Sequence, residues 1–257
     1  MNIFETHAHY DDKQFPDREQ VIEACHAAGI QYIVNCASDI ASCKQTLALA
    51  EKLPYVYAAV GVHPHSASEM DEDNLDRLFG YLTSSDKVVA VGEIGLDYHY
   101  DFSPRDVQQE WFIEQIELAK EFEKPIIVHT REALEDTYNI LKDYSYGLVG
   151  GIIHSYNGSV EMAERFVDMG FHIGIGGMVT FPKVRKVLET VRVLPLDRLV
   201  VETDSPYLAP VPNRGKRNDS RNLTYIVEKI AEVRGMEPEE VAEATLRNAC
   251  RLFGIES

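Results

Sequence analysis

Residues 2–9 read Asn-Ile-Phe-Glu-Thr-His-Ala-His, so a short apolar run leads directly into two histidines. The same arrangement returns four more times, with an apolar, strand-like run that ends on a side chain of a metal-binding type. These runs are residues 87–92 before Glu93, 125–128 before His129, 150–153 before His154, and 198–201 before Glu202, Thr203 and Asp204. Because a (β/α)8 barrel builds its active site at the C-terminal ends of its strands, this pattern predicts such a barrel.

Strand-like and helix-like segments alternate along the whole chain, which predicts eight βα units. The predicted strands are 2–6, 32–36, 56–61, 88–92, 126–128, 148–153, 172–175 and 199–202. The predicted helices are 17–28, 40–53, 71–82, 104–122, 133–143, 160–169, 182–190, 221–234 and 238–253. The length of 257 residues suits one barrel, and no linker interrupts the chain, so we expect a single domain over residues 1–257. A doubly wound open sheet is the competing fold, but only a closed barrel brings ligands from strands 1, 4, 5, 6 and 8 together.

The charge balance is strongly acidic, with 25 basic and 42 acidic residues and a net charge of −17. This disfavours non-specific binding to nucleic acid or to anionic membranes, although a few cations can still form a local basic groove. No apolar run approaches the roughly 18–20 residues that span a bilayer, so we expect no membrane association. The four cysteines form no CxxC pair, and Cys25 and Cys250 fall in helical patterns as buried residues. We therefore expect a reduced, cytoplasmic protein.

The histidine pair and the glutamate have the spacing and surroundings of metal ligands. His7 and His9 are two residues apart on an extended segment, so both rings point to the same side. Gly92 and Gly95 leave room around Glu93, whose two carboxylate oxygens can bridge two ions about 3.5–4 Å apart. Buried ion pairing of Glu93 with an arginine is the alternative.

His129 and His154 each follow a β-branched run, where two histidines at strand ends favour ligation over simple burial. Asp204 can both ligate a metal and accept the proton of an attacking water. Glu202 is the weaker candidate because we place it within its strand, where it can instead be a buried partner of an arginine or histidine. Four histidines, one glutamate and one aspartate exceed the needs of one ion, so the sequence predicts a two-metal hydrolase site.

Other polar side chains are expected at the edge of this site, facing a phosphate. They are His63, His65, Arg131, Arg214, Lys216 and Arg217, and the last three form the densest basic cluster of the chain. Loop packing is the alternative for the two histidines, and a solvated loop is the alternative for the basic cluster. Three tyrosines near the ligand motifs, Tyr98, Tyr156 and Tyr207, either stack on nucleic-acid bases or pack the barrel mouth.

Over essentially its whole length the chain resembles the TatD family of metal-dependent deoxyribonucleases, within the amidohydrolase superfamily of barrels. The matching segments are Glu5-Thr6-His7-Ala8-His9, Gly61-Val62-His63-Pro64-His65, Gly92-Glu93-Ile94-Gly95-Leu96-Asp97-Tyr98, Ile153-His154-Ser155, Glu202-Thr203-Asp204-Ser205-Pro206-Tyr207-Leu208 and Arg214-Gly215-Lys216-Arg217-Asn218. The family usually has Asp where Glu5 stands and Cys where Ala8 stands. In addition, Tyr156-Asn157-Gly158 replaces a more usual Phe-Ser-Gly turn, which can alter the substrate pocket.

The resemblance implies that His7, His9, Glu93 and Asp204 hold one divalent ion, and that Glu93, His129 and His154 hold the second, with Glu93 as the bridge. An imidazole-rich site suits Zn, Mn, Ni or Fe, and its carboxylates also admit Mg. The implied activity is cleavage of DNA from the 3′ end of single strands, by a monomer, with Asp204 accepting the proton of the attacking water.

Two other functions fit the same residues. One is hydrolysis of a small amide, lactone or phosphotriester, because the same metal cage serves those reactions. The other is a non-catalytic metal-binding or nucleic-acid-binding module, which a full set of ligands and a base at Asp204 disfavours.

Overall fold

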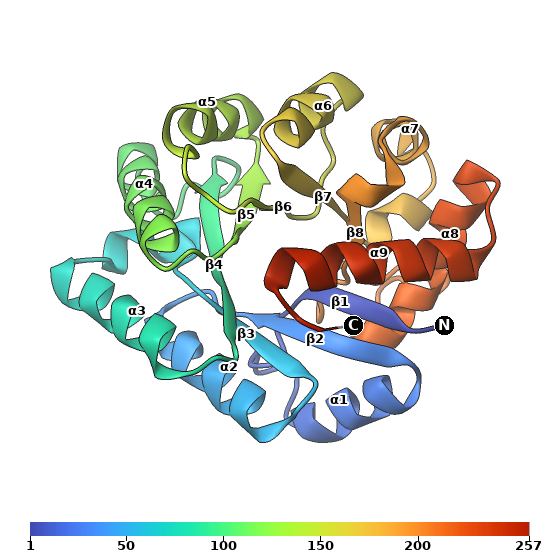
Figure 1. Ribbon diagram of the computed structural model, residues 1–257, viewed down its shortest axis with the longest axis horizontal. Coiled ribbons are helices and arrows are strands. Elements are labelled where there is room, and N and C mark those ends of the chain that lie inside the picture. The colour runs from blue at the N-terminus through green and yellow to red at the C-terminus, as the bar shows by residue number, and fades with distance from the viewer. Residues whose placement is uncertain (257) are drawn as a thin grey trace. The chain divides into compact units, whose positions relative to one another are not determined.

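The computed structural model describes residues 1–256, and within them strands and helices alternate as the sequence predicts (Figure 1). The contacts divide the chain into two compact units, residues 1–35 with 155–257 and residues 36–154, which we call unit 1 and unit 2 and describe separately. The single-domain organisation stays a prediction. No helix of residues 1–256 has the length and apolar character needed to cross a membrane.

Unit 1 contains the first and last strands of the chain, with helices that cover them. Its elements are β1 (Ile3–Ala8), α1 (Arg18–Ala27), β2 (Ile30–Cys36, whose last residue opens unit 2), α6 (Val160–Asp168), β7 (Phe171–Ile175), α7 (Arg185–Val193), β8 (Leu199–Val201), α8 (Leu223–Arg234) and α9 (Pro238–Phe253), with short 3₁₀ turns at Gly177–Thr180, Leu196–Arg198 and Ser220–Asn222. β1 pairs with β2 and β7 pairs with β8, both in parallel, and a parallel bridge joins Ala8 to Ser205 just after β8. The two ends of the chain therefore share one sheet segment.

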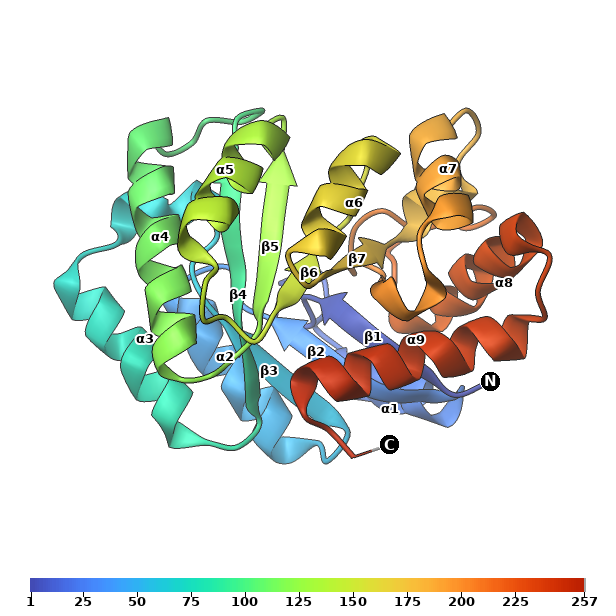
Figure 2. The same cartoon turned by 45° about the horizontal axis from the view of Figure 1, so that its top comes forward.

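Unit 2 contains the four middle strands. Its elements are α2 (Ile40–Lys52), β3 (Val56–Val60), a 3₁₀ turn (Pro64–Glu69), α3 (Glu72–Ser84), β4 (Val88–Asp97), α4 (Arg105–Glu121), β5 (Ile126–Arg131), α5 (Leu134–Tyr144) and β6 (Gly151–Ile153). β3, β4, β5 and β6 pair in this order and in parallel. α4 packs on β4 and α5 packs on β5, as both views show (Figure 2).

Most strand residues are buried, which explains the continuous apolar runs of the strands. All residues of β1 and β4 are buried, so their polar members must find partners inside the protein. α9 covers β1 and β8, and Phe253 from this helix lies 5.7 Å, centroid to centroid, from Phe4 of β1. Cys25 and Cys250 are buried, as predicted.

Three strands run beyond their predicted C-terminal ends, and this changes the position of three ligand-type residues. β1 continues through His7 to Ala8. β4 continues through Glu93 to Asp97, and β5 continues through His129 to Arg131. The prediction that these strands end at their ligands is therefore wrong, because backbone pairing continues where the apolar run stops. The reverse error concerns Glu202, which lies just after β8 and not within it.

Candidate metal centre

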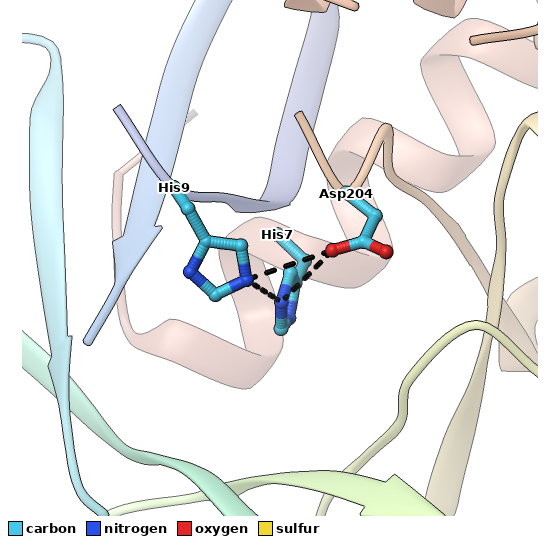
Figure 3. A group of neighbouring side chains, drawn as sticks. All are labelled: His7, His9 and Asp204. Carbon is cyan, nitrogen blue, oxygen red and sulfur yellow. Dashed lines mark hydrogen bonds and ion pairs between the residues drawn. The ribbon is translucent and has the colours of Figure 1, made fainter. Parts of the chain in front are cut away.

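In unit 1, two histidines and one aspartate converge on a point (Figure 3). The Nε2 atoms of His7 and His9 lie 3.0 Å apart, and Oδ1 of Asp204 lies 3.9 Å and 3.5 Å from them. His7 and His9 are buried, while the Asp204 side chain keeps 18% of its surface exposed. Two imidazole nitrogens and one carboxylate oxygen with an open side form a donor set typical of catalytic divalent ions.

The backbone holds this cluster together across the two ends of the chain. The amide N–H of His9 donates to the carbonyl of Ser205 (2.7 Å), and the amide N–H of Asp204 donates to the carbonyl of His7 (3.0 Å). Asp204 has a φ of 59°, a left-handed conformation that costs a non-glycine residue roughly 1–2 kcal/mol. The strand pairing compensates this cost and turns the carboxylate toward the two imidazoles.

Glu5 fastens the same region from inside. One of its oxygens accepts hydrogen bonds from the amide N–H of His7 (3.2 Å) and of Thr203 (2.8 Å), and the other accepts from the Thr203 hydroxyl (2.6 Å). Complete burial raises the pKa of Glu5 to about 8, although these hydrogen bonds oppose the rise. The glutamate that replaces the more usual aspartate thus ties β1 to the segment that carries Asp204.

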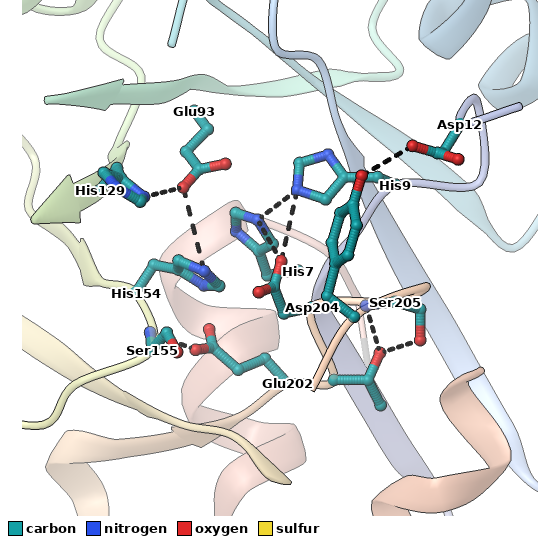
Figure 4. A network of polar contacts seen from close by, with 12 residues as sticks. His7, His9, Asp12, Glu93, His129, His154, Ser155, Glu202, Asp204 and Ser205 are labelled. Atoms are coloured by element: carbon teal, nitrogen blue, oxygen red, sulfur yellow. Dashed lines mark hydrogen bonds and ion pairs between the residues drawn. The ribbon is translucent and has the colours of Figure 1, made fainter. Parts of the chain in front are cut away.

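In unit 2, three imidazoles surround the carboxylate of Glu93, and Figure 4 shows two of them, His129 and His154. Oε1 of Glu93 lies 2.8 Å from Nδ1 of His129 and 3.9 Å from Nε2 of both His63 and His154. The side chains of Glu93 and His154 are each only 4% exposed. The structure therefore brings the predicted ligands of this unit together and places the buried His63 beside them. Its contact with a phosphate stays a prediction.

Glycines make room for this cluster, as the sequence predicts. The pairing of β4 with β5 shifts register between Val91 and Ile94, and this irregularity contains Glu93. Gly95 has a φ of +139°, and a Cβ atom on it would lie 2.0 Å from the carbonyl oxygen of His129. No other residue fits at this position without moving the strand that carries His129.

Asp97 determines which ring nitrogen of His129 carries the proton. Its Oδ2 lies 3.1 Å from Nε2 of His129 and 2.9 Å from Nε2 of His65. An ionised carboxylate can only accept, so Nε2 of His129 carries a proton and a neutral ring has its lone pair on Nδ1, facing Glu93. This carboxylate–histidine arrangement is how proteins orient imidazole ligands.

The pKa values of this pair follow from the same contacts. Burial raises the pKa of Asp97, but hydrogen bonds from His129, the Tyr100 amide and His65 outweigh it and hold this pKa well below its usual range. Burial lowers the pKa of His129, but the hydrogen bonds to Asp97 and Glu93 more than compensate and raise it.

His63 has the opposite tautomer. Its Nδ1 accepts a hydrogen bond from the amide N–H of His65 (3.1 Å), so a neutral ring carries its proton on Nε2. That N–H lies on the side of Glu93, where it can donate to an oxygen atom of a bound substrate. We therefore assign His63 a donor role beside the predicted ligands.

The residues of both clusters fit divalent ions. Nδ1 of neutral His129 and Oε1 of ionised Glu93 are both acceptors, yet they lie 2.8 Å apart. A shared cation would satisfy both lone pairs. In unit 1, His7, His9 and Asp204 offer ligand atoms within 4.8 Å of one another.

Glu202 has a structural contact that the sequence does not reveal. Its Oε1 accepts a 2.5 Å hydrogen bond from the amide N–H of Ser155, the residue that follows His154 (Figure 4). A Cβ atom on Gly174 of β7 would lie 2.5 Å from Oε2 of Glu202, so this glycine gives the carboxylate its space.

The predicted phosphate-facing cations lie in two places. Arg131 ends β5 in unit 2, with its guanidinium 4.7 Å from the centroid of the Tyr100 ring. In the loop after β8, the guanidinium of Arg214 lies 4.0 Å from the Phe181 ring centroid, and Lys216 is exposed. Arg217 pairs with Asp17 (2.7 Å and 3.0 Å), so its charge is already neutralised.

Of the two alternatives for the tyrosines, packing inside the protein holds for Tyr98 and Tyr156, because both residues are buried. The hydroxyl of Tyr98 donates to Asp136, and that of Tyr156 donates to the carbonyl of Ser159. Tyr207 is 48% exposed, and its hydroxyl donates to Asp12. Of the three tyrosines, only Tyr207 can offer a ring face.

Three comparisons identify the relatives of this chain. The family described as TatD related DNase matches residues 4–254. The uncharacterized metal-dependent hydrolase YabD of Bacillus subtilis (strain 168) is 44% identical over 254 residues, which cover 98% of this chain and 99% of YabD. The 3′-5′ ssDNA/RNA exonuclease TatD of Salmonella typhimurium is 34% identical over 261 residues, covering 98% and 99%.

Among solved structures, the crystal structure of YjjV, a TatD homologue from Escherichia coli K12, matches with a TM-score of 0.94 and 34% identity. The match covers 99% of this chain and 98% of YjjV, and it confirms the predicted (β/α)8 barrel. With the family match over almost its entire length, the chain belongs to the TatD family of metal-dependent hydrolases.

Proposed function

We propose that this protein hydrolyses phosphodiester bonds of single-stranded DNA and releases nucleotides from the 3′ end. The observation that carries the proposal is that each unit has its own cluster of histidines and a carboxylate, as a two-ion phosphodiesterase requires. The named activity of the Salmonella relative, a 3′-5′ ssDNA/RNA exonuclease, supports this substrate class.

In the proposed enzyme, His7, His9 and Asp204 would hold one divalent ion, and Glu93, His129 and His154 would hold another. A bridging role of Glu93 and a count of two ions stay predictions. Bound divalent ions would lower the pKa of water and stabilise charge on the phosphate. The mixture of imidazole and carboxylate donors admits Mg, Mn, Zn or Ni.

The protein's own side chains then perform four tasks. Asp204 orients the attacking water and accepts its proton. The left-handed backbone at this residue points its carboxylate toward His7 and His9. Asp97 keeps Nδ1 of His129 available as a ligand. The Nε2–H of His63 donates to a phosphate oxygen. Arg131 supplies a positive charge two residues beyond His129 on β5.

The basic loop after β8 contributes less uniformly than its sequence suggests. Arg217 is held by Asp17 and by the carbonyl of Gln14, so we assign it to loop structure. Arg214 and Lys216 remain as the phosphate contacts proposed for this loop, and His65 contributes through its hydrogen bond to Asp97.

The test is release of nucleotides from single-stranded DNA labelled at either end. The protein is stripped of metal and supplied with Mg, Mn, Zn or Ni, and Glu93→Ala is the control for contaminating nucleases. Metal-dependent loss of the 3′ label that is absent in Glu93→Ala supports the proposal. DNA that stays intact with every metal, although the protein binds divalent ions, would refute it.

The charge of the substrate distinguishes the nuclease from the alternative, a hydrolase of small neutral molecules. Replacing both Arg214 and Lys216 by alanine should slow cleavage of DNA while leaving hydrolysis of a neutral lactone unchanged, because only the polyanion requires these cations. Equal rates of DNA cleavage in wild type and variant would remove this loop from the proposal. The expected monomer and the cytoplasmic location stay predictions.

A further inference from the structure

Two exposed aromatic rings lie side by side in the segment that follows β4. Tyr100 is 47% exposed and Phe102 is 66% exposed, although both are large and apolar. Their rings are stacked, with centroids 5.1 Å apart and planes inclined by only 17°. Because Phe102 exposes two thirds of its surface, a planar group can reach its ring. We call these two residues the aromatic pair.

Hydrogen bonds fix the backbone on both sides of the aromatic pair. The amide N–H of Tyr100 donates to Oδ1 of Asp97 (3.0 Å). After the pair, the Ser103 hydroxyl donates to the carbonyl of His65 (3.1 Å), and the Gln108 side chain donates to the carbonyl of Ser103 (2.8 Å). The rings are therefore presented by a fixed segment, which lowers the entropic cost of binding a partner.

The charges around the aromatic pair favour an anionic ligand with a planar group. Asp101 forms an ion pair with Arg105, and Glu132 accepts a hydrogen bond from Nδ1 of His99 (2.7 Å), so each of these two carboxylates already has a partner. The guanidinium of Arg131 lies over the Tyr100 ring and forms no ion pair within residues 1–256. An exposed cation beside exposed rings is the combination found in single-strand binding sites.

The aromatic pair is also continuous with the metal cluster of unit 2. The His65 ring contacts the Phe102 ring edge to face at 4.8 Å, and His65 shares Asp97 with His129. Arg131 and His129 are two residues apart on β5, so their side chains lie on the same face of the strand. A chain bound to the ligands of this unit would therefore pass the cation and the rings.

We propose that Tyr100 and Phe102 form a stacking site for a nucleobase of the single-stranded substrate, with Arg131 on a neighbouring phosphate. The inference rests on the proposed function and names a base subsite for it. A protein partner is a poorer fit, because two rings offer far less surface than the roughly 800 Å² per partner of a stable protein interface. Stacking needs no hydrogen-bond readout, so the site accepts any base.

The test combines a double variant with a substrate that lacks bases. Tyr100→Ala/Phe102→Ala is compared with wild type and with Tyr146→Ala, a control that removes an isolated ring 95% exposed in the same unit. The substrates are an ordinary single-stranded oligonucleotide and one of equal length built from abasic residues. Initial rates give kcat/KM for each combination, and thermal unfolding checks that the variants fold.

We expect the double variant to lose roughly 5- to 150-fold in kcat/KM on the ordinary oligonucleotide, the range for one stacked base. On the abasic oligonucleotide it should equal wild type, and Tyr146→Ala should equal wild type on both. A double variant that still prefers the ordinary oligonucleotide as strongly as wild type does would overturn the stacking site but leave the nuclease proposal intact. If wild type cleaves neither oligonucleotide with any metal, both proposals fail.

Discussion

Replacing Asp97 by asparagine should disable one metal ligand without touching it. Oδ2 of Asp97 faces the Nε2 atoms of His129 and His65, and its Oδ1 accepts from the amide N–H groups of His99 and Tyr100. Asparagine has one oxygen and one NH₂ group. If the oxygen keeps the two amide contacts, the NH₂ group faces the imidazoles and moves the His129 proton to Nδ1, where it blocks ligation. If the amide is flipped, its NH₂ group faces the amide N–H groups of His99 and Tyr100, which are also donors, so those two hydrogen bonds are lost.

The expected magnitude follows from the loss of the acceptor behind a ligating histidine, which typically costs 10- to 100-fold in metal affinity. This corresponds to about 1.4–2.7 kcal/mol of binding free energy. Competition titration of the metal-free protein with zinc and a chromophoric chelator measures the affinity. Asp136→Asn is the matched control, because Asp136 also accepts a hydrogen bond from a buried residue, Tyr98, but contacts no histidine within residues 1–256. An Asp97→Asn protein that folds and binds zinc as tightly as wild type would refute the tautomer argument.

Three further perturbations test other parts of the structure. Asp204→Asn should still bind metal but lose turnover, because the amide can ligate through oxygen but cannot accept a proton; normal turnover in a nuclease assay would exclude Asp204 as the base. Gly95→Ala should lower the free energy of unfolding in urea by roughly 2–4 kcal/mol, because position 95 has a positive φ and an added Cβ would clash with the His129 carbonyl oxygen. Gly80→Ala should instead raise this free energy by about 0.5–1 kcal/mol, because position 80 lies in helix α3 with open space around it. If the two substitutions had equal effects, the steric argument would be wrong. Burial raises the pKa of Cys25 to about 11, so its thiol should stay unreactive toward a disulfide reagent at pH 8 until the protein is unfolded, and rapid labelling of native protein would contradict this.

Most elements could be predicted from the sequence because their signals are local. Helix α9 has the predicted bounds, since Pro238 begins it, the side chains of Glu237 and Glu240 form a capping box, and Gly254 ends it in a left-handed conformation. The ends of β4 and β5 could not be predicted, because beyond Glu93 the strand is held by pairing with a neighbour, through a glycine, and not by an apolar run. Pairing of this kind is a long-range property.

The residues that make up the two clusters were predictable, since histidine or a carboxylate after an apolar run is visible in the sequence. Their orientation was not. The partner of His129 is Asp97, 32 residues away, and only the pairing of β4 with β5 brings them together. One signal was present: Asp97 lies four residues after Glu93 on one strand, so both side chains point to the same face. The exposure of Phe102, in contrast, has no signature in the sequence.

The backbone hydrogen bonds that join His7 to Asp204 and His9 to Ser205 can form only after both segments have been synthesised. His7 and His9 precede Asp204 by almost two hundred residues along the chain. The ligands of unit 2, in contrast, have all been made once His154 has been added. A growing chain therefore holds the two histidines of this cluster without their carboxylate until all of unit 2 has been synthesised, so the donor set of His7, His9 and Asp204 is completed only after the donor set of unit 2.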